Sequence, residues 1–413
     1  MSGVPMEGVI VLTRRQFLAN SVVGAATLVI WPKLTFAATG SDTRFLFVLL
    51  RGGLDGLESV PPYGDPGYAA IRGALALSPS AARPAHKLDN LFALHPSFDC
   101  AAQLYARGQF MPVVAAAPPY WGRSHFQAQN CVENGTAKPD GAQTGWLNRC
   151  IACMPGVTGL ACAAVMPLTM RGAARVETWS PPLPTDVNPI LLQRLQPLYA
   201  ADARLAAPFA HAIAQQHDSP VPESGIGSTA TGGKAGKNRQ GALPVMMAAA
   251  GKFMGKADGP RVAFVEDDGW DTHANEAAIV TRKIAELDAG LEAFHQSMGQ
   301  SWNRTLVVVA TEFGRTAHIN GTGGTDHGTG GSMFLAGGAL RGGRVAGDWP
   351  GIGAGELYQN RDVHATTDFR SIFKGVLSAH LGVPESLLES RVFPGSAGAK
   401  PMEHLVAPER AAA

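Results

Sequence analysis

The sequence predicts an α/β fold with a mostly parallel central sheet flanked by helices. Three observations support this prediction. Short, uninterrupted apolar runs, typical of strands buried on both faces, occur at residues 44–50, 261–265 and 304–310. Residues 275–297, between the last two runs, have apolar side chains at helical spacing. Strand, helix, strand is the repeating unit of a parallel sheet that helices cover on both faces.

The remaining elements follow the same logic in chain order. The first strand, residues 44–50, is ended by a pair of glycines. A further candidate for a parallel strand, residues 109–114, contains Pro112, which lacks the N–H that a central strand donates. Toward the C-terminus, residues 366–388 carry apolar residues on one side of a helix.

The N-terminus has the order of a bacterial export signal. Arg14 and Arg15 precede an uncharged, mainly apolar run at residues 18–31, which is shorter than the ~20 apolar residues that span a bilayer. A cleavage-like site ends at Ala37. We predict that residues 1–38 are a twin-arginine signal peptide, that the twin-arginine translocase exports the folded chain, and that the mature protein is periplasmic or otherwise exported. The alternative is a buried N-terminal helix that follows two arginines.

The rest of the chain is predicted to be one domain. About 375 residues remain after the signal segment, a length that favours a single domain over residues 39–413. Residues 225–241 are rich in Gly, Ser, Thr and Lys and predict a loop inserted in that domain. Residues 181–189 are dense in proline and predict an extended segment.

Composition excludes several classes of function. Hydrophobic residues make up 46% of the chain and charged residues 16%, with a formal net charge of +1. Because no basic block occurs, we expect no nucleic-acid partner. No second apolar run of membrane length follows the signal segment, so we expect no stable membrane span in the mature chain.

The cysteines leave three alternatives. Five are present, so they cannot all pair within one chain. Cys150 and Cys153 form a C-x-x-C motif, which suits a redox pair, half a zinc site, or two residues of a helix. A zinc site requires a second pair at suitable spacing, and the sequence has none. We expect structural cysteines with at most one disulfide.

Side chains able to bind a metal follow the predicted strands or occupy a glycine-rich loop. They are Asp55, Asp271, His273, Glu312, Asp326 and His327. In open α/β sheets, ligands bind beyond the carboxyl ends of the strands. Carboxylates and imidazoles gathered there require a cation to neutralise them, so the sequence predicts a shared metal site. Taken singly, each has an ordinary structural explanation as a turn, a helix cap or an ion pair.

Five motifs together resemble a known bacterial family. They are Arg51-Gly-Gly-Leu-Asp55-Gly, Arg123-Ser124-His125-Phe126-Gln127-Ala128-Gln129, Gly269-Trp270-Asp271-Thr272-His273, Thr311-Glu312-Phe313-Gly314-Arg315-Thr316 and Gly324-Thr325-Asp326-His327-Gly328. The family is an uncharacterised domain of unknown function, often exported by the twin-arginine route. It is classed with the alkaline phosphatase/sulfatase-like superfamily. The resemblance covers nearly all of the mature chain and implies an alkaline phosphatase-like fold.

The resemblance also implies roles for individual residues. Ser124, at a helix start that favours anions, would be the nucleophile, with His125 beside it. Arg315 or Arg123 would clamp the oxygens of a tetrahedral anion. The metal ligands would be Asp55, Asp271, His273, Glu312, Asp326 and His327. Ser124 is equally explained as a helix cap.

The sequence departs from the superfamily at two positions and lacks the sulfatase motif. Asp271 and His273 are separated by one residue, where relatives have three. Glu312 is followed by Phe313, where relatives have Asp-His, so a second metal would lose a ligand. The segment at Cys153 lacks the arginine of the sulfatase motif, which excludes a formylglycine sulfatase.

The resulting hypothesis is an exported, metal-dependent hydrolase of phosphate or related esters. It would use a Ser nucleophile or a metal-bound water, and one or two divalent ions of Zn, Mn, Mg or Ca, on a small-molecule ester. The alternative is a non-catalytic metal-binding accessory or binding protein on the same fold. A redox protein using Cys150 and Cys153 is a third hypothesis.

Overall fold

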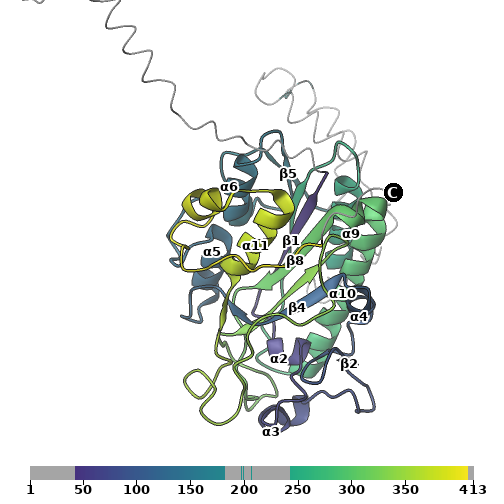
Figure 1. Ribbon diagram of the computed structural model, residues 1–413, viewed down its shortest axis with the longest axis vertical. Coiled ribbons are helices and arrows are strands. Elements are labelled where there is room, and N and C mark those ends of the chain that lie inside the picture. The colour runs from purple at the N-terminus through teal and green to yellow at the C-terminus, as the bar shows by residue number, and fades with distance from the viewer. Residues whose placement is uncertain (1–41, 182–196, 198, 200–205, 207–241, 408–413) are drawn as a thin grey trace, which may run out of the picture. The chain divides into compact units, whose positions relative to one another are not determined.

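The computed structural model describes residues 42–181, 197, 199, 206 and 242–407 (Figure 1). The predicted signal segment at residues 1–38, the predicted loop at 225–241 and residues 182–189 of the proline-dense segment lie outside this part of the chain. These three assignments therefore stay predictions.

The main sheet has eight strands in the order β10-β4-β9-β8-β1-β7-β5-β6. Their bounds are β1 (Arg44–Leu50), β4 (Phe110–Ala117), β5 (Gly159–Cys162), β6 (Val176–Trp179), β7 (Val262–Asp267), β8 (Thr305–Thr311), β9 (Gly331–Ala336) and β10 (Thr367–Asp368). Strand β9 runs antiparallel to both of its neighbours, and every other pair is parallel. A separate two-stranded sheet joins β2 (His86–Lys87) and β3 (Ala93–Leu94). The predicted mostly parallel sheet is confirmed.

Helices cover both faces of the main sheet (Figure 1). On one face lie α5 (His125–Asn134), α6 (Trp146–Ala152) and α11 (Phe369–Leu381), and on the other lie α4 (Asp99–Ala106), α9 (Ala242–Met254) and α10 (Glu276–Met298). The shorter elements are α2 (Gly56–Ser59), α3 (Tyr68–Arg72), η1 (Gly73–Leu75), η2 (Leu168–Met170), η4 (Gly299–Arg304), α12 (Glu385–Leu387) and η5 (Leu388–Val392). The predicted helices at residues 275–297 and 366–388 correspond to α10 and to the segment from α11 to α12.

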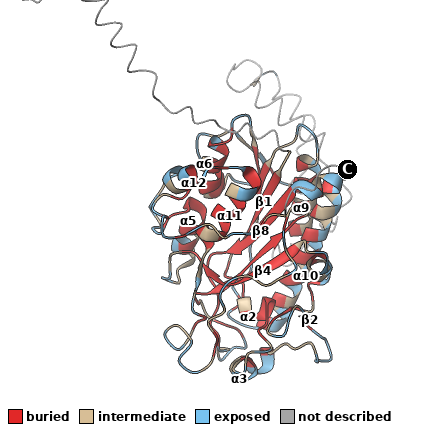
Figure 2. Cartoon of the chain, in the orientation of Figure 1, coloured by how far each residue is buried: buried red, intermediate tan, exposed pale blue. Residues whose placement is uncertain are grey.

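The core follows from the alternation of side chains along the central strand. All seven residues of β1 are buried, and the central strands of the sheet are coloured as buried in Figure 2. Phe47 points to the α5–α6–α11 face, where its ring centroid lies 5.4 Å from that of Trp146 and 5.1 Å from that of Phe373. Val48 points to the opposite face and packs in the cluster that contains Leu287. Burial on both faces explains why this strand is an uninterrupted apolar run.

Strand β4 corrects one prediction. Residues 109–114 were expected in a parallel strand, but β4 pairs antiparallel with β9 and meets the two-residue β10 on its other side. The carbonyl of Pro112 accepts a hydrogen bond from the N–H of Ala346. A residue in a strand directs its N and its carbonyl to the same side, so the missing N–H of Pro112 faces away from β9. The proline therefore removes no hydrogen bond from the β4–β9 ladder.

The cysteines do not support a redox function. All five are free thiols, and Cys150 and Cys153 lie at the end of α6, away from solvent. Burial raises the pKa of Cys131 to about 11 and that of Cys162 to about 12, and it raises the pKa of Cys150 as well. A redox-active thiol needs exposure and a lowered pKa, whereas Cys150 and Cys153 are buried and burial raises the pKa of both, so the structure does not support the redox hypothesis.

No helix in the described part of the chain has both the length and the apolar character needed to cross a bilayer.

Candidate metal centre

Three neighbouring strands bring the candidate residues together. Strands β8, β1 and β7 are adjacent and parallel, so the loops that follow them meet at one edge of the sheet. Asp271 and His273 lie in the loop from β7 to α10, and His327 lies in the loop from β8 to β9. His125 is the first residue of α5. The sequence prediction of a crevice at the carboxyl ends of the strands matches this arrangement.

Three imidazoles and one carboxylate lie close together, and the shortest distances join them through Nε2 of His327 and the carboxylate of Asp271. The Nε2 atom of His327 lies 2.9 Å from Nε2 of His125 and 3.0 Å from Nε2 of His273. Asp271 places Oδ1 3.0 Å from Nε2 of His273 and 3.3 Å from Nε2 of His327. Its Oδ2 lies 3.4 Å from Nε2 of His125. Among the described residues, His125, Asp271 and His327 form a group whose ligand atoms all lie within 4.8 Å of one another.

Each of these imidazoles is held at its other nitrogen, Nδ1, by an oxygen acceptor. The pairs are His327 with the carbonyl oxygen of Arg123 at 2.9 Å, His125 with Glu312 at 2.8 Å, and His273 with Asp326 at 3.1 Å. Carbonyl and carboxylate oxygens only accept, so each Nδ1 carries a proton. Each neutral ring then directs the lone pair of Nε2 into the cluster, which is the tautomer that binds metals.

The electrostatics favour a cation at the centre. Burial would raise the pKa of the three carboxyls here, but hydrogen bonds outweigh it and lower the pKa of Asp271, Glu312 and Asp326. Burial lowers the pKa of His327, whereas the hydrogen bond to Glu312 raises that of His125. Lone pairs about 3 Å apart, beside ionised carboxylates, require either a proton or a metal ion between them.

Glu312 holds His125 and does not face the centre. Its side chain is fully buried. Its two oxygens accept hydrogen bonds from the N–H groups of Gly52 and Gly53, the hydroxyl of Thr311 and the side chains of His125 and Gln129. These donors occupy both oxygens of Glu312. The predicted direct ligation by Glu312 is therefore replaced by an indirect role through His125.

Gly52 has no room for a side chain. Its backbone is in the left-handed region, with φ 124°, and a Cβ built on it would lie 2.3 Å from the backbone N of Asp271. Glycine therefore allows the end of β1 to approach the loop that carries Asp271.

Arg315 also differs from its predicted role. Its fully buried guanidinium donates to Asp271 Oδ1 at 2.7 Å, to the carbonyl of Gly52 at 3.2 Å and to both oxygens of Thr325. A substrate oxygen cannot reach it. Arg315 orients the carboxylate of Asp271 instead of clamping an anion.

The backbone of Arg123 supports His327. Arg123 has φ 57°, a left-handed conformation uncommon for a residue with a side chain, and its carbonyl holds Nδ1 of His327. Its guanidinium is bound to Asp362 at 2.6 Å and to Gln359 at 2.8 Å. The ion pair with Asp362 fixes this strained residue next to α5.

Ser124 is the N-cap residue of α5, but its side chain makes no capping hydrogen bond. Gln127, at the third position after Ser124, where a capping-box partner would stand, is bound to the hydroxyl of Tyr120 instead. Capping alone therefore does not explain Ser124. Its half-buried hydroxyl stands at a helix N-terminus, one residue before His125.

Asp55 does not join the centre. It is the N-cap of α2, where its Oδ1 accepts hydrogen bonds from the N–H groups of Leu57 and Glu58. Its Oδ2 accepts from Arg72 at 2.7 Å, and both side chains are buried. The prediction of metal ligation by Asp55 is corrected to a buried ion pair with Arg72, because this arginine already neutralises the carboxylate.

A buried carboxyl beside this ion pair gives the chain a pH-dependent stability. Burial and the neighbouring Asp55 raise the pKa of Glu276 to about 9, against about 4.3 in an unfolded chain. The folded state thus keeps a proton that the unfolded state releases. This contribution to stability is fully present below about pH 4.3 and is lost as the pH rises through about 9, with a slope of at most about 1.4 kcal/mol per pH unit.

We expect Glu276→Gln to lose this slope, because glutamine cannot ionise. Denaturant unfolding of wild type and variant at pH 5 and pH 8 measures it. The free energy of unfolding of the variant should rise relative to wild type between the two values. Equal pH dependence in both proteins would show that Glu276 is ionised in the folded state.

Several supporting residues were given no role in the sequence prediction. Gln129 lies one turn after His125 on α5, a spacing visible in the sequence, and donates to Glu312. Asn320 donates to Asp326 at 3.3 Å. Asp362 left no signal, because its contact with Arg123 joins segments 239 positions apart.

Comparisons with known proteins support a family resemblance. Residues 198–390 match the model of a family described as a protein of unknown function (DUF1501), which confirms the resemblance to a family of unknown function. No curated protein matches the chain significantly.

Solved structures that align with this chain include the alkaline phosphatase from the Antarctic bacterium TAB5, at 12% identity, 71% coverage of this chain, 91% coverage of that chain and a TM-score of 0.32. Another is the PsFucS1 sulfatase from Pseudoalteromonas sp., at 14% identity, 81% and 68% coverage and a TM-score of 0.35. Similarities this distant transfer no residue role to this chain.

Proposed function

We propose that this chain binds one divalent cation and is a metal-dependent hydrolase of phosphate or related esters. One observation carries the proposal. Three imidazole Nε2 atoms and the carboxylate of Asp271 converge, and an oxygen acceptor fixes each imidazole in its metal-binding tautomer. Such second acceptors are typical of histidines that bind metals.

The donor set narrows the choice of metal. His125, His327 and Asp271 would supply two nitrogens and one carboxylate, and His273, next to His327 and Asp271, could add a third nitrogen. Magnesium and calcium prefer oxygen ligands, whereas imidazole suits zinc and other transition metals. Among Zn, Mn, Mg and Ca, this set therefore favours zinc. Asp55 is paired to Arg72, and hydrogen-bond donors occupy both oxygens of Glu312. Because these two carboxylates are not available as ligands, the described residues favour one cation over two.

The chain's own groups position the reacting parts. Arg315 keeps Asp271 ionised and oriented, and Glu312 keeps the lone pair of His125 directed inward. The side chains of Asp271 and His273 are 39% and 47% exposed, so a substrate can approach. A divalent cation there would lower the pKa of a water or of the Ser124 hydroxyl and polarise the ester bond.

Hydrolysis would transfer the phosphoryl or sulfuryl group to the oxygen of water. The P–O or S–O bond to the alcohol breaks, and the alcohol leaves with the proton that the water gives up. If the hydroxyl of Ser124 attacks first, water later releases the group from the serine oxygen, and the balance is the same.

A non-catalytic metal-binding protein is the second candidate. If His273 binds together with His125, His327 and Asp271, four donors fill a tetrahedral coordination, which is typical of structural zinc sites. The guanidinium groups of Arg123 and Arg315 are also bound to carboxylates, so neither is free to hold a substrate oxyanion.

Elemental mass spectrometry of the mature protein, followed by an ester screen, tests the proposal. We expect about one equivalent of zinc after reconstitution, and hydrolysis of phosphate or sulfate monoesters. Ser124→Ala should abolish this hydrolysis if the serine hydroxyl is the nucleophile, and leave it intact if a metal-bound water is the nucleophile. One equivalent of metal without turnover of any ester would establish the accessory protein. Absence of bound metal after reconstitution would refute both.

We also propose that the protein acts outside the cytoplasm. The paired Arg14 and Arg15 before an apolar run support this proposal. Changing both to lysine should leave an uncleaved precursor in the cytoplasm, as detected by cell fractionation and mass measurement. Unchanged export of that variant would contradict a twin-arginine route.

A further inference from the structure

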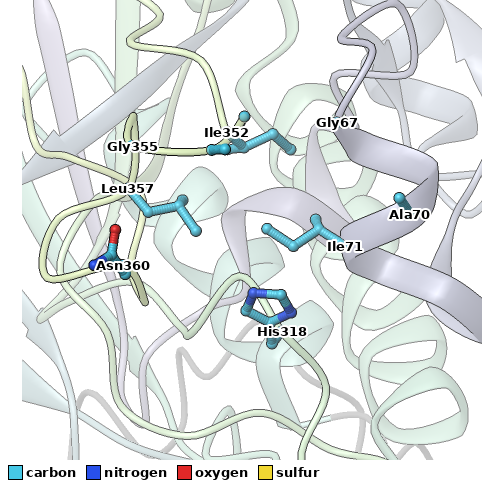
Figure 3. Close-up of a pocket in the computed structure, with 10 residues that line it drawn as sticks. Gly67, Ala70, Ile71, His318, Ile352, Gly355, Leu357 and Asn360 are labelled. Carbon is cyan, nitrogen blue, oxygen red and sulfur yellow. The ribbon is translucent and has the colours of Figure 1, made fainter.

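A pocket of about 370 Å³ is lined by ten residues, none of which is a predicted metal ligand (Figure 3). Three segments form its walls: α3 with Ala70 and Ile71, the 352–360 loop with Ile352, Leu357 and Asn360, and the loop after β8 with His318. None of the described residues that line it is Asp, Glu, Lys or Arg. The walls are mainly apolar, with the imidazole of His318 and the amide of Asn360 as polar groups.

Each wall is tied to the metal centre. His318 follows Arg315, which holds Asp271, by three residues, so the two backbones lie within about 11 Å of each other along the chain. Asn360 lies two residues before Asp362, which forms an ion pair with Arg123. The carbonyl oxygen of Arg123 in turn holds Nδ1 of His327.

The α3 wall is anchored in the same way. Arg72, the last residue of α3, donates from Nη1 to the carbonyl oxygen of Ala317, at 3.4 Å. Ala317 directly precedes His318, so the helix that carries Ala70 and Ile71 is held against the loop that leaves the centre. The pocket and the cation-binding residues are therefore parts of one structure.

We propose that this pocket binds the uncharged, apolar part of the substrate, so that the substrate is a phosphate or sulfate monoester of an aryl or similarly apolar alcohol. This inference rests on the proposed function of the metal centre. The charged group of such an ester would lie at the centre, and its ring would lie among Ile71, Ile352 and Leu357. A volume of about 370 Å³ falls in the range of small-molecule sites, which are mainly apolar with a few polar groups.

The absence of charge on the lining sets the specificity. A charged substituent on the alcohol would lose its hydration without gaining an ionic partner. A ring loses little, and its hydroxyl oxygen finds donors in His318 or Asn360. A small alcohol such as methanol would leave the pocket unfilled and gain nothing from it.

A pair of variants on α3 tests the inference. Ala70 lines the pocket, while its neighbour Ala69 is also exposed but does not line it. Ala70→Trp fills the pocket, and Ala69→Trp introduces the same side chain next to it. Thermal unfolding of both variants checks that the fold is kept.

The first measurement is calorimetric binding of 1-naphthol to the mature protein. We expect binding to wild type, to Ala69→Trp and to the metal-site variant Asp271→Ala, and a roughly tenfold or greater loss of affinity in Ala70→Trp. The second measurement is hydrolysis of 1-naphthyl phosphate and methyl phosphate. Ala70→Trp should raise KM for the naphthyl ester about tenfold or more and leave KM for the methyl ester unchanged.

The outcomes separate the two proposals. Binding of 1-naphthol that Ala70→Trp removes, with no turnover of either ester, would keep the pocket as a binding site and refute the hydrolase. Hydrolysis without any effect of Ala70→Trp on 1-naphthol binding or on KM would keep the hydrolase and overturn the pocket assignment.

Discussion

His327→Ala is expected to weaken zinc binding by more than about 100-fold. Nε2 of His327 is the atom that both other imidazoles approach, at 2.9 and 3.0 Å. Its removal leaves the remaining three donors without their shared neighbour and lets water into the centre. Loss of a partner that only orients a ligand typically costs 10–100-fold in metal affinity, so loss of the ligand itself should exceed that range. Competition with a chromophoric chelator measures the dissociation constant.

Two further variants calibrate this result. Glu312→Gln should weaken zinc binding by about 10–100-fold. Both carboxylate oxygens of Glu312 accept hydrogen bonds, whereas a glutamine side chain has only one acceptor oxygen. His404→Ala removes a histidine that is 75% exposed and outside the centre, and it should leave the affinity unchanged. Equal zinc affinity in wild type and His327→Ala would refute the assignment of the centre, whatever the other two variants do.

The sequence predicted the centre of the fold better than its edges. Strand β1 spans Arg44–Leu50, the predicted residues 44–50, because burial on both faces makes it wholly apolar. Strands β9 and β10 were missed. β10 has only two residues, too few to show a pattern, and β9 is a short run that directly follows a glycine-rich loop. The antiparallel direction of β9 depends on how the chain returns across the sheet, which no local pattern encodes.

The site shows the same division. The residues that follow strands β7 and β8 converge because parallel strands end at one edge. Their roles within the centre depend on contacts across the chain. Glu312 faces His125 instead of the centre because a helix 187 positions away begins there. Asp55 is drawn to Arg72, which lies on a separate short helix. A carboxylate after a strand thus indicates the neighbourhood of a site, and its partner decides whether it binds a metal.

Arg72→Ala is expected to lower the free energy of unfolding by about 3–5 kcal/mol. Arg72 is fully buried and donates to Asp55 at 2.7 Å and to Glu58 at 3.1 Å. Burial raises the pKa of Glu58 to about 7 even with this arginine present, whereas Arg72 holds the pKa of Asp55 below its ordinary value against the effect of burial. Without the guanidinium, buried carboxylates remain with no cation, and denaturant unfolding at pH 7 measures the loss.

The effect of pH on this variant separates lost charge from lost packing. With Arg72 absent, burial raises the pKa of Asp55 and Glu58, so protonation in acid restores stability, and the deficit should shrink from pH 7 to pH 5. Arg175→Ala is the matched control, because its side chain is 72% exposed and its ion pair with Glu177 lies at the surface, where such pairs contribute about 0–1 kcal/mol. A deficit in Arg72→Ala that stays constant with pH would mean that the cavity, and not the uncompensated charge, destabilises the protein. A deficit no larger than that of Arg175→Ala would contradict a buried ion pair beneath the metal centre.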